Sequence, residues 1–269
     1  MGYKIVALDT HRFLGWSRPK GYQFAASDLY CPISLSELKS SFWRFPIAFV
    51  KNNEGFDLVV LLGCQKNQNL FVAKDGTWIG EAVPMMYKNH PFKLLQVTGK
   101  EQGVTKEKLT LCIDEANEER DAEDNESFFT TEGKLTELVS QIANQLLNQK
   151  NSLAMTQEAC DKLYELDLIV PWEASVEMAT NEIKLGGLYC VDHDRLTKLS
   201  GKILKQLMTM DALSLIYMHL QSMQNISRFK FLVEAHNKAM GINTGALDDL
   251  NFGEPEGSGN INLGNLDHL

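Results

Sequence analysis

Hydrophobic and polar positions change their period near residue 114. Before it, short apolar runs are separated by turn residues, a pattern typical of β-strands. Strands are expected at residues 47–50, 56–63, 70–72, 92–97 and 109–113. The turn residues between them, Asn52–Gly55 and Asp75–Gly76 among others, predict an antiparallel meander.

Two local signals refine this half. Ser34 and Glu37 form the Ser-x-x-Glu pattern of a helix N-cap, which predicts a short helix over 34–42. The run from Leu58 to Leu62 is apolar throughout, so this strand is expected to be covered on both faces. Residues 84–87 are expected to form a helical turn, and 100–106 a polar loop.

After residue 130 apolar residues follow helical spacing. We expect a helix through 135–147, a second over 151–166 and a long helical region from 203 to about 236. A hairpin is expected between the last two, with strands at 176–178 and 183–191 around Thr180–Asn181.

The pattern therefore indicates an α+β protein, in which an N-terminal antiparallel β-meander packs against a C-terminal helical half with one β-hairpin. We expect an N-terminal extension over 1–26, a single domain over 27–236 and a disordered acidic tail over 237–269. Within the domain, residues 27–113 are strand-rich, 114–130 form an acidic loop and 131–236 are helix-rich. The two halves are expected to share one core, because the strands need helices to cover their second face.

Composition limits the partners. The formal net charge is -9 over 269 residues, which argues against nucleic acid and anionic lipid as partners. No apolar stretch reaches the roughly 18 to 20 residues that span a bilayer, and the N-terminus lacks the apolar core of a signal peptide. A cytoplasmic location is expected, with surface association by a non-classical route left open. The five cysteines are far apart without a Cys-x-x-Cys pair, which favours reduced thiols over a zinc or redox site.

Adjacent carboxylates stand where the last strand of the first half ends. Asp114 and Glu115 could bind a cation or act as acid and base if a pocket raised one pKa. Strand alternation directs them to opposite faces, so at most one could face a site. The alternative is a strand end that caps a helix.

A second cluster is Asp192, His193 and Asp194, which could ligate a metal ion together with His219. The alternative is helix capping by Asp192 or Asp194 beside an exposed His193. Tyr217 and His219 are also candidates for catalysis, although buried Tyr and His residues usually serve as hydrogen-bonding groups in a core. No P-loop and no Gly-x-Gly-x-x-Gly occurs, and no cofactor is expected.

Binding residues can also be named. Asn225 and Arg228 are three residues apart on the predicted helix and could orient a carboxylate ligand or partner. Trp78, with Trp43 and Trp172, could line a sugar or peptide site; the alternative is that these rings are core.

Six segments, in this order and spacing, resemble the bacterial SapC family over roughly residues 27–231. They are Phe45–Phe49, Asn69–Val72, Pro91–Phe92, Leu111–Glu115, Gly187–Asp192 and Leu215–Met223. The family takes its name from a gene associated with the bacterial surface layer and differs from a peptide-transporter permease that shares the name. The resemblance implies a link to surface-layer or envelope processes and no catalytic residues.

The function expected is that of a non-enzymatic cytoplasmic binding or accessory protein. A protein partner is expected, bound in part through the tail 241–269, while the oligomeric state stays open. The alternative is an enzyme with an acid/base or metal-assisted site built from Asp114, Glu115, Asp192, His193 and His219.

Overall fold

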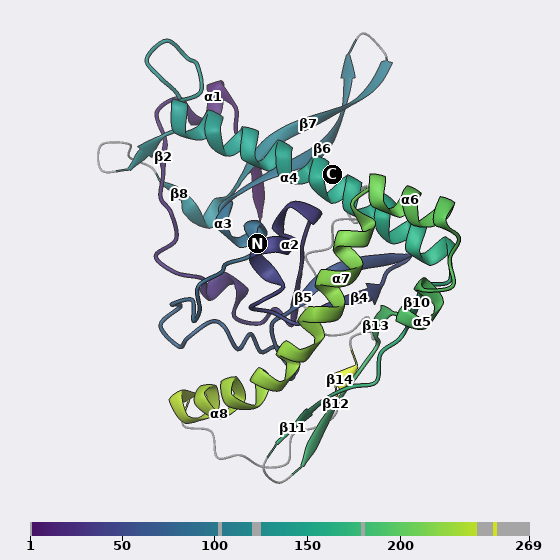
Figure 1. Ribbon diagram of the computed structural model, residues 1–269. Coiled ribbons are helices and arrows are strands. Elements are labelled where there is room, and N and C mark those ends of the chain that lie inside the picture. Colours follow the sequence, from purple (N-terminus) through teal and green to yellow (C-terminus); the bar gives the residue numbers. More distant parts are fainter. Residues whose placement is uncertain (1, 102–103, 120–124, 179–180, 241–249, 252–269) are drawn as a thin grey trace. The chain divides into compact units, whose positions relative to one another are not determined.

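Strands dominate the chain before residue 114 and helices dominate it afterwards, so the protein is of the α+β class that the sequence predicts. The structure is a computed structural model that describes residues 2–101, 104–119, 125–178, 181–240 and 250–251. By its internal contacts the chain forms two units. Figure 1 labels their helices and strands. Unit 1 holds the described parts of Met1–Lys20 and Tyr87–Lys150, and unit 2 those of Gly21–Met86 and Asn151–Ile261.

Unit 1 contains a long hairpin. Strands β6 (Phe92–Glu101) and β7 (Val104–Asp114) pair antiparallel, and β1 (Tyr3–Ile5) pairs with the other edge of β7. Most of the polar loop expected at 100–106 is therefore strand, and that prediction is wrong. Lys100 pairs with Thr105 and Glu101 with Val104, so pairing across the hairpin overrides the polarity of these residues.

A short sheet completes unit 1. Strand β2 (Gly15–Trp16) lies between β8 (Glu118–Glu119) and β9 (Glu126–Ser127), so the expected acidic loop contains paired backbone; residues 120–124 lie outside the described part. Helix α1 (Leu8–His11) precedes β2. The core of unit 1 draws on the hairpin, this sheet and a helix, and its buried members are Trp16, Phe92, Leu111, Ile113, Phe128, Val139, Ile142 and Leu146.

One helix replaces the two that were expected between 135 and 166. Helix α4 (Glu137–Glu165) runs without a break, because the stretch from Asn148 to Asn151 contains neither Gly nor Pro. Leu135 precedes the helix. Residues 137–150 belong to unit 1 and 151–165 to unit 2, so the division between the units falls inside α4 and not in the acidic segment. A single domain over 27–236 stays a prediction.

Unit 2 is built on a five-stranded antiparallel sheet of order β10-β13-β4-β5-β3. The predicted hairpin is confirmed: β4 (Ile47–Lys51) and β5 (Phe56–Leu61) pair around a turn. Residues 58–62 are buried, as expected for a strand covered on both faces. The other strands are β3 (Tyr30–Pro32), β10 (Ile169–Pro171) and β13 (Leu188–Val191). Strands from both halves of the sequence thus share one sheet.

A smaller sheet in unit 2 contains the predicted hairpin of β11 (Ala174–Glu177) and β12 (Glu182–Gly186), with β14 (Leu250–Asn251) parallel to β12. The strand expected over 183–191 is two strands, because Gly187 takes φ 76° between them. The strand expected at 70–72 is also absent: Val72 and Trp78 form only an isolated bridge.

Helices complete unit 2. The predicted cap is confirmed, since Ser34 and Glu37 form a capping box on η2 (Leu35–Glu37), which continues into α2 (Leu38–Ser41). The expected helical region after 200 breaks at Asp211, which takes φ 57°. The remaining helices are η1 (Gln23–Ala25), α3 (Met85–Lys88, which crosses the unit division), α5 (His193–Leu196), α6 (Gly201–Thr209), α7 (Ala212–Ser222), η4 (Met223–Arg228) and α8 (Phe229–Met240).

Two further expectations concern the ends of the chain and membranes. The expected extension 1–26 contributes β1, α1 and the buried Trp16 to unit 1, while its η1 belongs to unit 2. Of the expected tail 237–269, residues 237–240 belong to α8 and 250–251 to β14, and the rest lies outside the described residues. None of the described helices combines the length and apolar character that crossing a membrane requires.

Candidate functional site

A row of polar side chains runs along α7 and η4 in unit 2. Its members are spaced three residues apart and all form hydrogen bonds with main-chain atoms of residues 42–47: they are His219, Ser222, Asn225 and Arg228. Residues three apart lie on one face of a helix, and in a 3₁₀-helix such as η4 they align almost directly. We call this set the polar row.

His219 is the most buried member, with no exposed surface. Its Nε2 accepts a hydrogen bond from the Val191 amide at 3.2 Å, so the ring proton lies on Nδ1, which donates to the Ile47 carbonyl at 2.9 Å. Burial lowers the pKa of His219 to about 4. Both nitrogens are used by the main chain, so His219 links α7 to strands β4 and β13 and offers no free ligand atom.

Ser222 and Asn225 continue the row. The Ser222 hydroxyl accepts from the Ile47 amide at 3.0 Å and donates to the His219 carbonyl at 2.6 Å. The Asn225 amide donates to the carbonyls of Phe42 and Phe45, at 2.7 and 3.1 Å. These bonds hold main-chain groups from Phe42 to Ile47, the first residue of β4, so the row fixes the path of residues 42–47.

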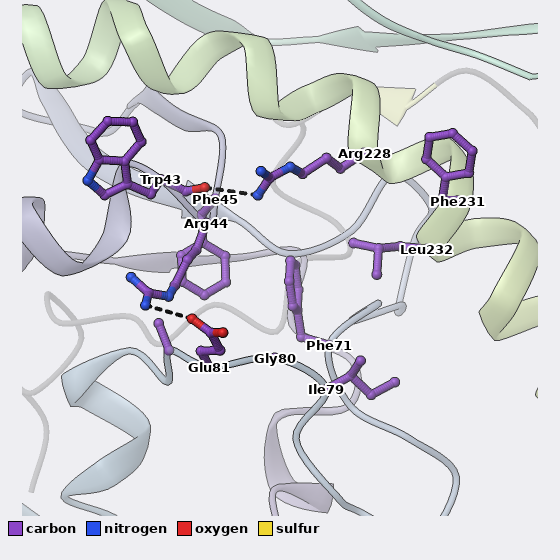
Figure 2. Close-up of a pocket in the computed structure, with 11 residues that line it drawn as sticks. Trp43, Arg44, Phe45, Phe71, Ile79, Gly80, Glu81, Arg228, Phe231 and Leu232 are labelled. Carbon is purple, nitrogen blue, oxygen red and sulfur yellow. Dashed lines mark hydrogen bonds and ion pairs between the residues drawn. The ribbon is translucent and has the colours of Figure 1, made fainter.

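Arg228 ends the row at a cavity (Figure 2). Its Nη1 donates to the Trp43 carbonyl at 2.9 Å. The cavity measures about 620 Å³ and lies within unit 2. It is lined by residues of three segments: Trp43, Arg44, Phe45, Phe71, Ile79, Gly80, Glu81, Ala82, Arg228, Phe231 and Leu232. We call it the aromatic pocket.

The floor of the aromatic pocket is rigid and its rim is exposed. Phe45 and Phe71 are buried and meet edge to face with ring centroids 4.9 Å apart. The rim residues are Trp43, Ile79 and Phe231, which expose 60%, 43% and 68% of their surface. Large apolar side chains at such exposure around a concavity distinguish this place from ordinary surface.

The charged groups of the aromatic pocket are two arginines and one glutamate. Arg44 Nη2 lies 2.8 Å from Glu81 Oε2, and Arg44 Nη1 donates to the Ser40 carbonyl at 3.0 Å. Arg44 Nε is buried and has no hydrogen-bond partner. Within the described part of the chain, Arg228 forms no ion pair. The pocket therefore carries one uncompensated positive charge.

Two of the predicted binding residues support the pocket and one lines it. Arg228 lines the cavity, whereas Asn225 acts beneath it through the polar row. Trp78 stacks on Phe71 with centroids 5.7 Å apart and donates from Nε1 to the Ala82 carbonyl at 2.7 Å. Their role in ligand binding stays a prediction.

Of the three rim residues, only Trp43 was named from the sequence; Ile79 and Phe231 were not. Phe231 stands in the segment Phe229–Phe231, and residues two apart on a helix face different directions. Phe229 is accordingly buried while Phe231 is exposed. Phe231 is apolar but does not lie on the buried face of α8. This mismatch is the sequence signal that could have identified it as a rim residue.

The second predicted cluster forms a helix cap. Asp192 Oδ1 accepts from the Arg195 amide and its Oδ2 lies 3.0 Å from Arg195 Nε, while His193 and Asp194 are exposed. Among the described residues, no group of three or more His, Cys, Asp or Glu side chains could hold a metal ion. Tyr217 is half exposed on α7 and faces away from His219.

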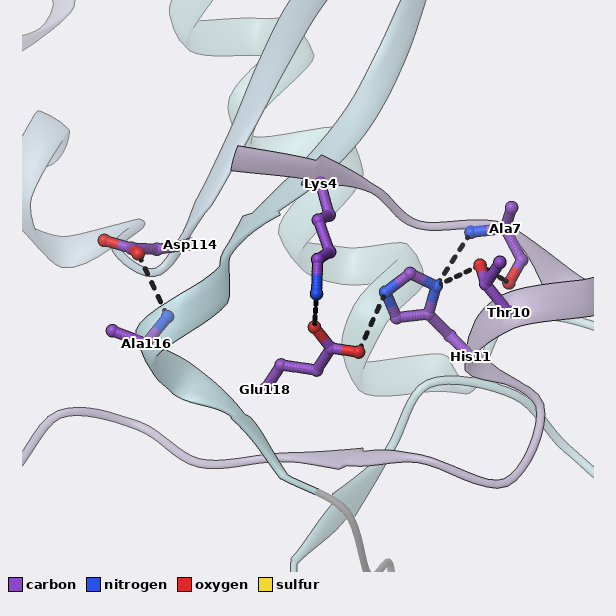
Figure 3. Close-up of polar contacts among 7 residues, drawn as sticks. All are labelled: Lys4, Ala7, Thr10, His11, Asp114, Ala116 and Glu118. Atoms are coloured by element: carbon purple, nitrogen blue, oxygen red, sulfur yellow. Dashed lines mark hydrogen bonds and ion pairs between the residues drawn. The ribbon is translucent and has the colours of Figure 1, made fainter. Parts of the chain in front are cut away.

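The first predicted pair lies in unit 1 (Figure 3). Asp114 is 2% exposed and accepts from the Ala116 amide at 3.2 Å, which caps η3 (Glu115–Asn117). Glu115 is exposed. Only one carboxylate of the pair is thus buried, and it is occupied in a cap.

Unit 1 also holds a polar cluster around His11 that the sequence did not indicate (Figure 3). His11 is 2% exposed; its Nδ1 accepts from the Ala7 amide at 3.3 Å and lies 2.7 Å from Thr10 Oγ1. Its Nε2 lies 3.9 Å from Glu118 Oε1 without a hydrogen bond, and Glu118 pairs with Lys4 at 2.9 Å.

All five cysteines are free, and Cys190 alone is more than slightly exposed. Burial raises the pKa of Cys64 to about 12 and that of Cys112 to about 11. Burial also raises the pKa of Cys160 and Cys190. Such thiols stay protonated at neutral pH and are poor nucleophiles.

The protein is therefore of the α+β class and carries an aromatic pocket with an exposed rim. The polar row holds the segment 42–47, which forms part of the pocket wall. The model of the SapC family matches residues 7–229, and the chain therefore belongs to this family. No curated protein and no solved structure matches the chain. The matched range includes the polar row in unit 2 and, in unit 1, α1 and β2.

Proposed function

We propose that this protein is a non-enzymatic binding protein and that the aromatic pocket receives an apolar side chain of a protein partner. The carrying observation is the exposure of Trp43, Ile79 and Phe231 around a cavity of about 620 Å³. A volume of this size lies within the range of roughly 300 to 1,000 Å³ that ligand sites occupy. Trp, Phe and Arg are also enriched where partners are anchored.

The way the pocket is built supports the proposal. Four side chains of the polar row hold residues 42–47, and those residues carry Trp43 and Arg44 into the wall. A wall fixed by hydrogen bonds is pre-organised, so less conformational entropy is lost on binding. Three residues of the enzyme alternative, Asp114, Asp192 and His219, are instead engaged in caps and main-chain contacts.

The wider role is part of the same proposal. We place the protein in the cytoplasm as an accessory of surface-layer or envelope processes, a link that rests on the SapC family alone. The partner is a protein, and the segment 241–269 takes part in holding it. The net charge of -9 supports a partner other than nucleic acid.

A comparison of two exposed phenylalanines tests the proposal. Phe231→Ser removes the rim, and Phe13→Ser removes an equally apolar residue that is 80% exposed in unit 1. Tagged full-length proteins are used to capture partners from native lysate, with proteins quantified by mass spectrometry. We expect at least one protein to be enriched by the parent chain and by Phe13→Ser, and to fall at least tenfold with Phe231→Ser.

Equal capture by all three proteins would contradict the proposal, provided that their far-ultraviolet circular dichroism is the same. A fourth protein, which ends at Met240, tests the segment 241–269. If it captures the same partner at the same level, the tail has no part in binding, and the pocket proposal stands without it.

A further inference from the structure

The charges that line the aromatic pocket point to the chemistry of the partner. Arg44, Arg228 and Glu81 are its charged lining residues, so the pocket has a net positive charge in a chain of net charge -9. A local excess of positive charge on a negatively charged protein makes the pocket complementary to an anionic group.

Arg228 is held in place and still has donors to offer. Within the described residues only its Nη1 is used, in the bond to the Trp43 carbonyl at 2.9 Å. A guanidinium has five N–H donors, so the others remain for a ligand. Since one nitrogen is fixed by the wall, the group does not have to be ordered when a ligand binds.

Arg44 has one donor in an ion pair and a neighbouring donor without a partner. Nη2 contacts Glu81 at 2.8 Å, while Nε, which points to the same side of the guanidinium, is buried without an acceptor. A carboxylate can accept from Nε and Nη2 together, and such bidentate pairs are among the strong ones. Glu81 therefore binds one of the two donors, Nε and Nη2, on this side of the Arg44 guanidinium.

Glu81 is well placed to be displaced. It is 83% exposed, and exposed ion pairs contribute little to stability because water and salt screen them. Its carboxylate occupies the position that a ligand carboxylate would take. Displacement would leave Glu81 in water and satisfy both donors of Arg44.

From these contacts we propose that the partner of the aromatic pocket is an acidic protein segment. It inserts an aromatic or branched aliphatic side chain between Trp43 and Phe231, and a neighbouring Asp or Glu binds Arg228 and replaces Glu81 on Arg44. This inference rests on the proposed function and specifies the partner's chemistry. The wide exposed rim favours a peptide chain over a small acid, which would leave most of the rim uncovered.

Three acetylated 12-residue peptides probe the full-length protein by fluorescence anisotropy. Each carries the same Phe and Leu, and the flanking positions hold Asp in one peptide, Asn in the second and Lys in the third. We expect the Asp peptide to bind at least tenfold more tightly than the Lys peptide. Phe231→Ser should weaken every peptide that binds.

Charge-removing variants test the named residues. Arg228→Gln should weaken the Asp peptide about tenfold and leave the Asn peptide within twofold, while Arg228→Lys should restore part of the loss. Glu81→Gln should tighten the Asp peptide severalfold, because the competing carboxylate is gone. The matched control is Glu54→Gln in the turn between β4 and β5, which should change neither affinity.

The outcomes separate the two proposals. If all three peptides bind alike and Phe231→Ser abolishes binding, the pocket binds partners and the acidic preference is wrong. If Glu81→Gln weakens binding, or the Lys peptide is preferred, the partner is cationic and this inference is overturned. If no peptide binds while capture from lysate depends on Phe231, the acidic-segment inference fails and the proposed function stands; if neither occurs, both fail.

Discussion

His219 shows how a residue type associated with catalysis can be wholly structural. Its ring is buried and both nitrogens are bonded to main-chain groups of β4 and β13. A protonated imidazole would place a second donor against the Val191 amide. The ring is therefore held neutral, and protonating it would lower the stability of unit 2.

The pH dependence of stability follows from that cost. The folded pKa of His219 is about 4, below the ordinary value of about 6.5, so the unfolded chain binds the extra proton first. The contribution is fully present above pH 6.5 and is lost as pH falls toward 4, by up to about 3 kcal/mol. Urea unfolding at pH 7 and 4.5 measures it, and His219→Gln should show a smaller decline. Parallel declines would contradict this assignment.

Asp114 tests whether a buried carboxylate is there for its charge. As an N-cap it can be replaced by Asn at little cost, whereas Asp114→Ala should lower the free energy of unfolding by about 1 kcal/mol. Chemical denaturation of the two variants gives the comparison. If Asn is as damaging as Ala, the negative charge matters and the enzyme alternative gains support.

At the scale of elements, the sequence predicted what depends on neighbours and missed what depends on distant residues. The capping box at Ser34 and the β4–β5 hairpin were predicted because their partners lie within a few residues. The division of α4 into two helices was wrong because polar residues at 148–151 are as compatible with an exposed helix as with a loop.

The same reasoning applies to the site. Arg228 was predicted as a binding residue from its spacing to Asn225, yet the polar row could not be foreseen, because its acceptors lie about 180 residues away in the chain. Glu81 and Phe231 meet at the pocket only through tertiary structure. Any residue can supply a main-chain carbonyl or amide, so a hydrogen bond from a side chain to the main chain leaves no recognisable pair of residue types in a single sequence.

Glu37 gives the prediction for the element that precedes this site. Its carboxylate accepts from the Ser34 amide and hydroxyl and, at 2.7 Å, from the Met85 amide, so it joins η2 to the start of α3. Glu37→Ala should lower the free energy of unfolding by about 2–4 kcal/mol, since the buried Ser34 amide and the part-buried Met85 amide lose their acceptor. The control Glu54→Ala, at an exposed turn, should stay within about 0.5 kcal/mol.

At the scale of the whole molecule, α4 is the long helix that contributes to both units; the short α3 also crosses the division. Val139 and Ile142 are buried in unit 1, and Cys160 and Leu163 in unit 2. A helix that continues through both gives the unfolding of one unit a covalent and hydrogen-bonded link to the other. The single domain expected from the sequence would be a consequence of that link.

A proline in the middle of α4 examines the link. Asn151→Pro removes a helical hydrogen bond and clashes with the preceding turn, which should cost about 3 kcal/mol or more. Two versions that keep only Trp16 or only Trp78 report on unit 1 and unit 2 by fluorescence. We expect both midpoints to fall, while Asn151→Ala changes little. A fall in one unit alone would show that the units unfold separately.

The burial of four of the five free cysteines has a practical consequence. Native thiols of this kind react slowly with maleimides, so a single new cysteine at an exposed position would be labelled ahead of them. Glu234→Cys, three residues after Phe231 on α8, would place a photo-crosslinker beside the pocket rim and leave every lining residue in place. Covalent adducts formed when the labelled protein is added to lysate would then identify what touches the rim, including partners too short-lived to survive purification.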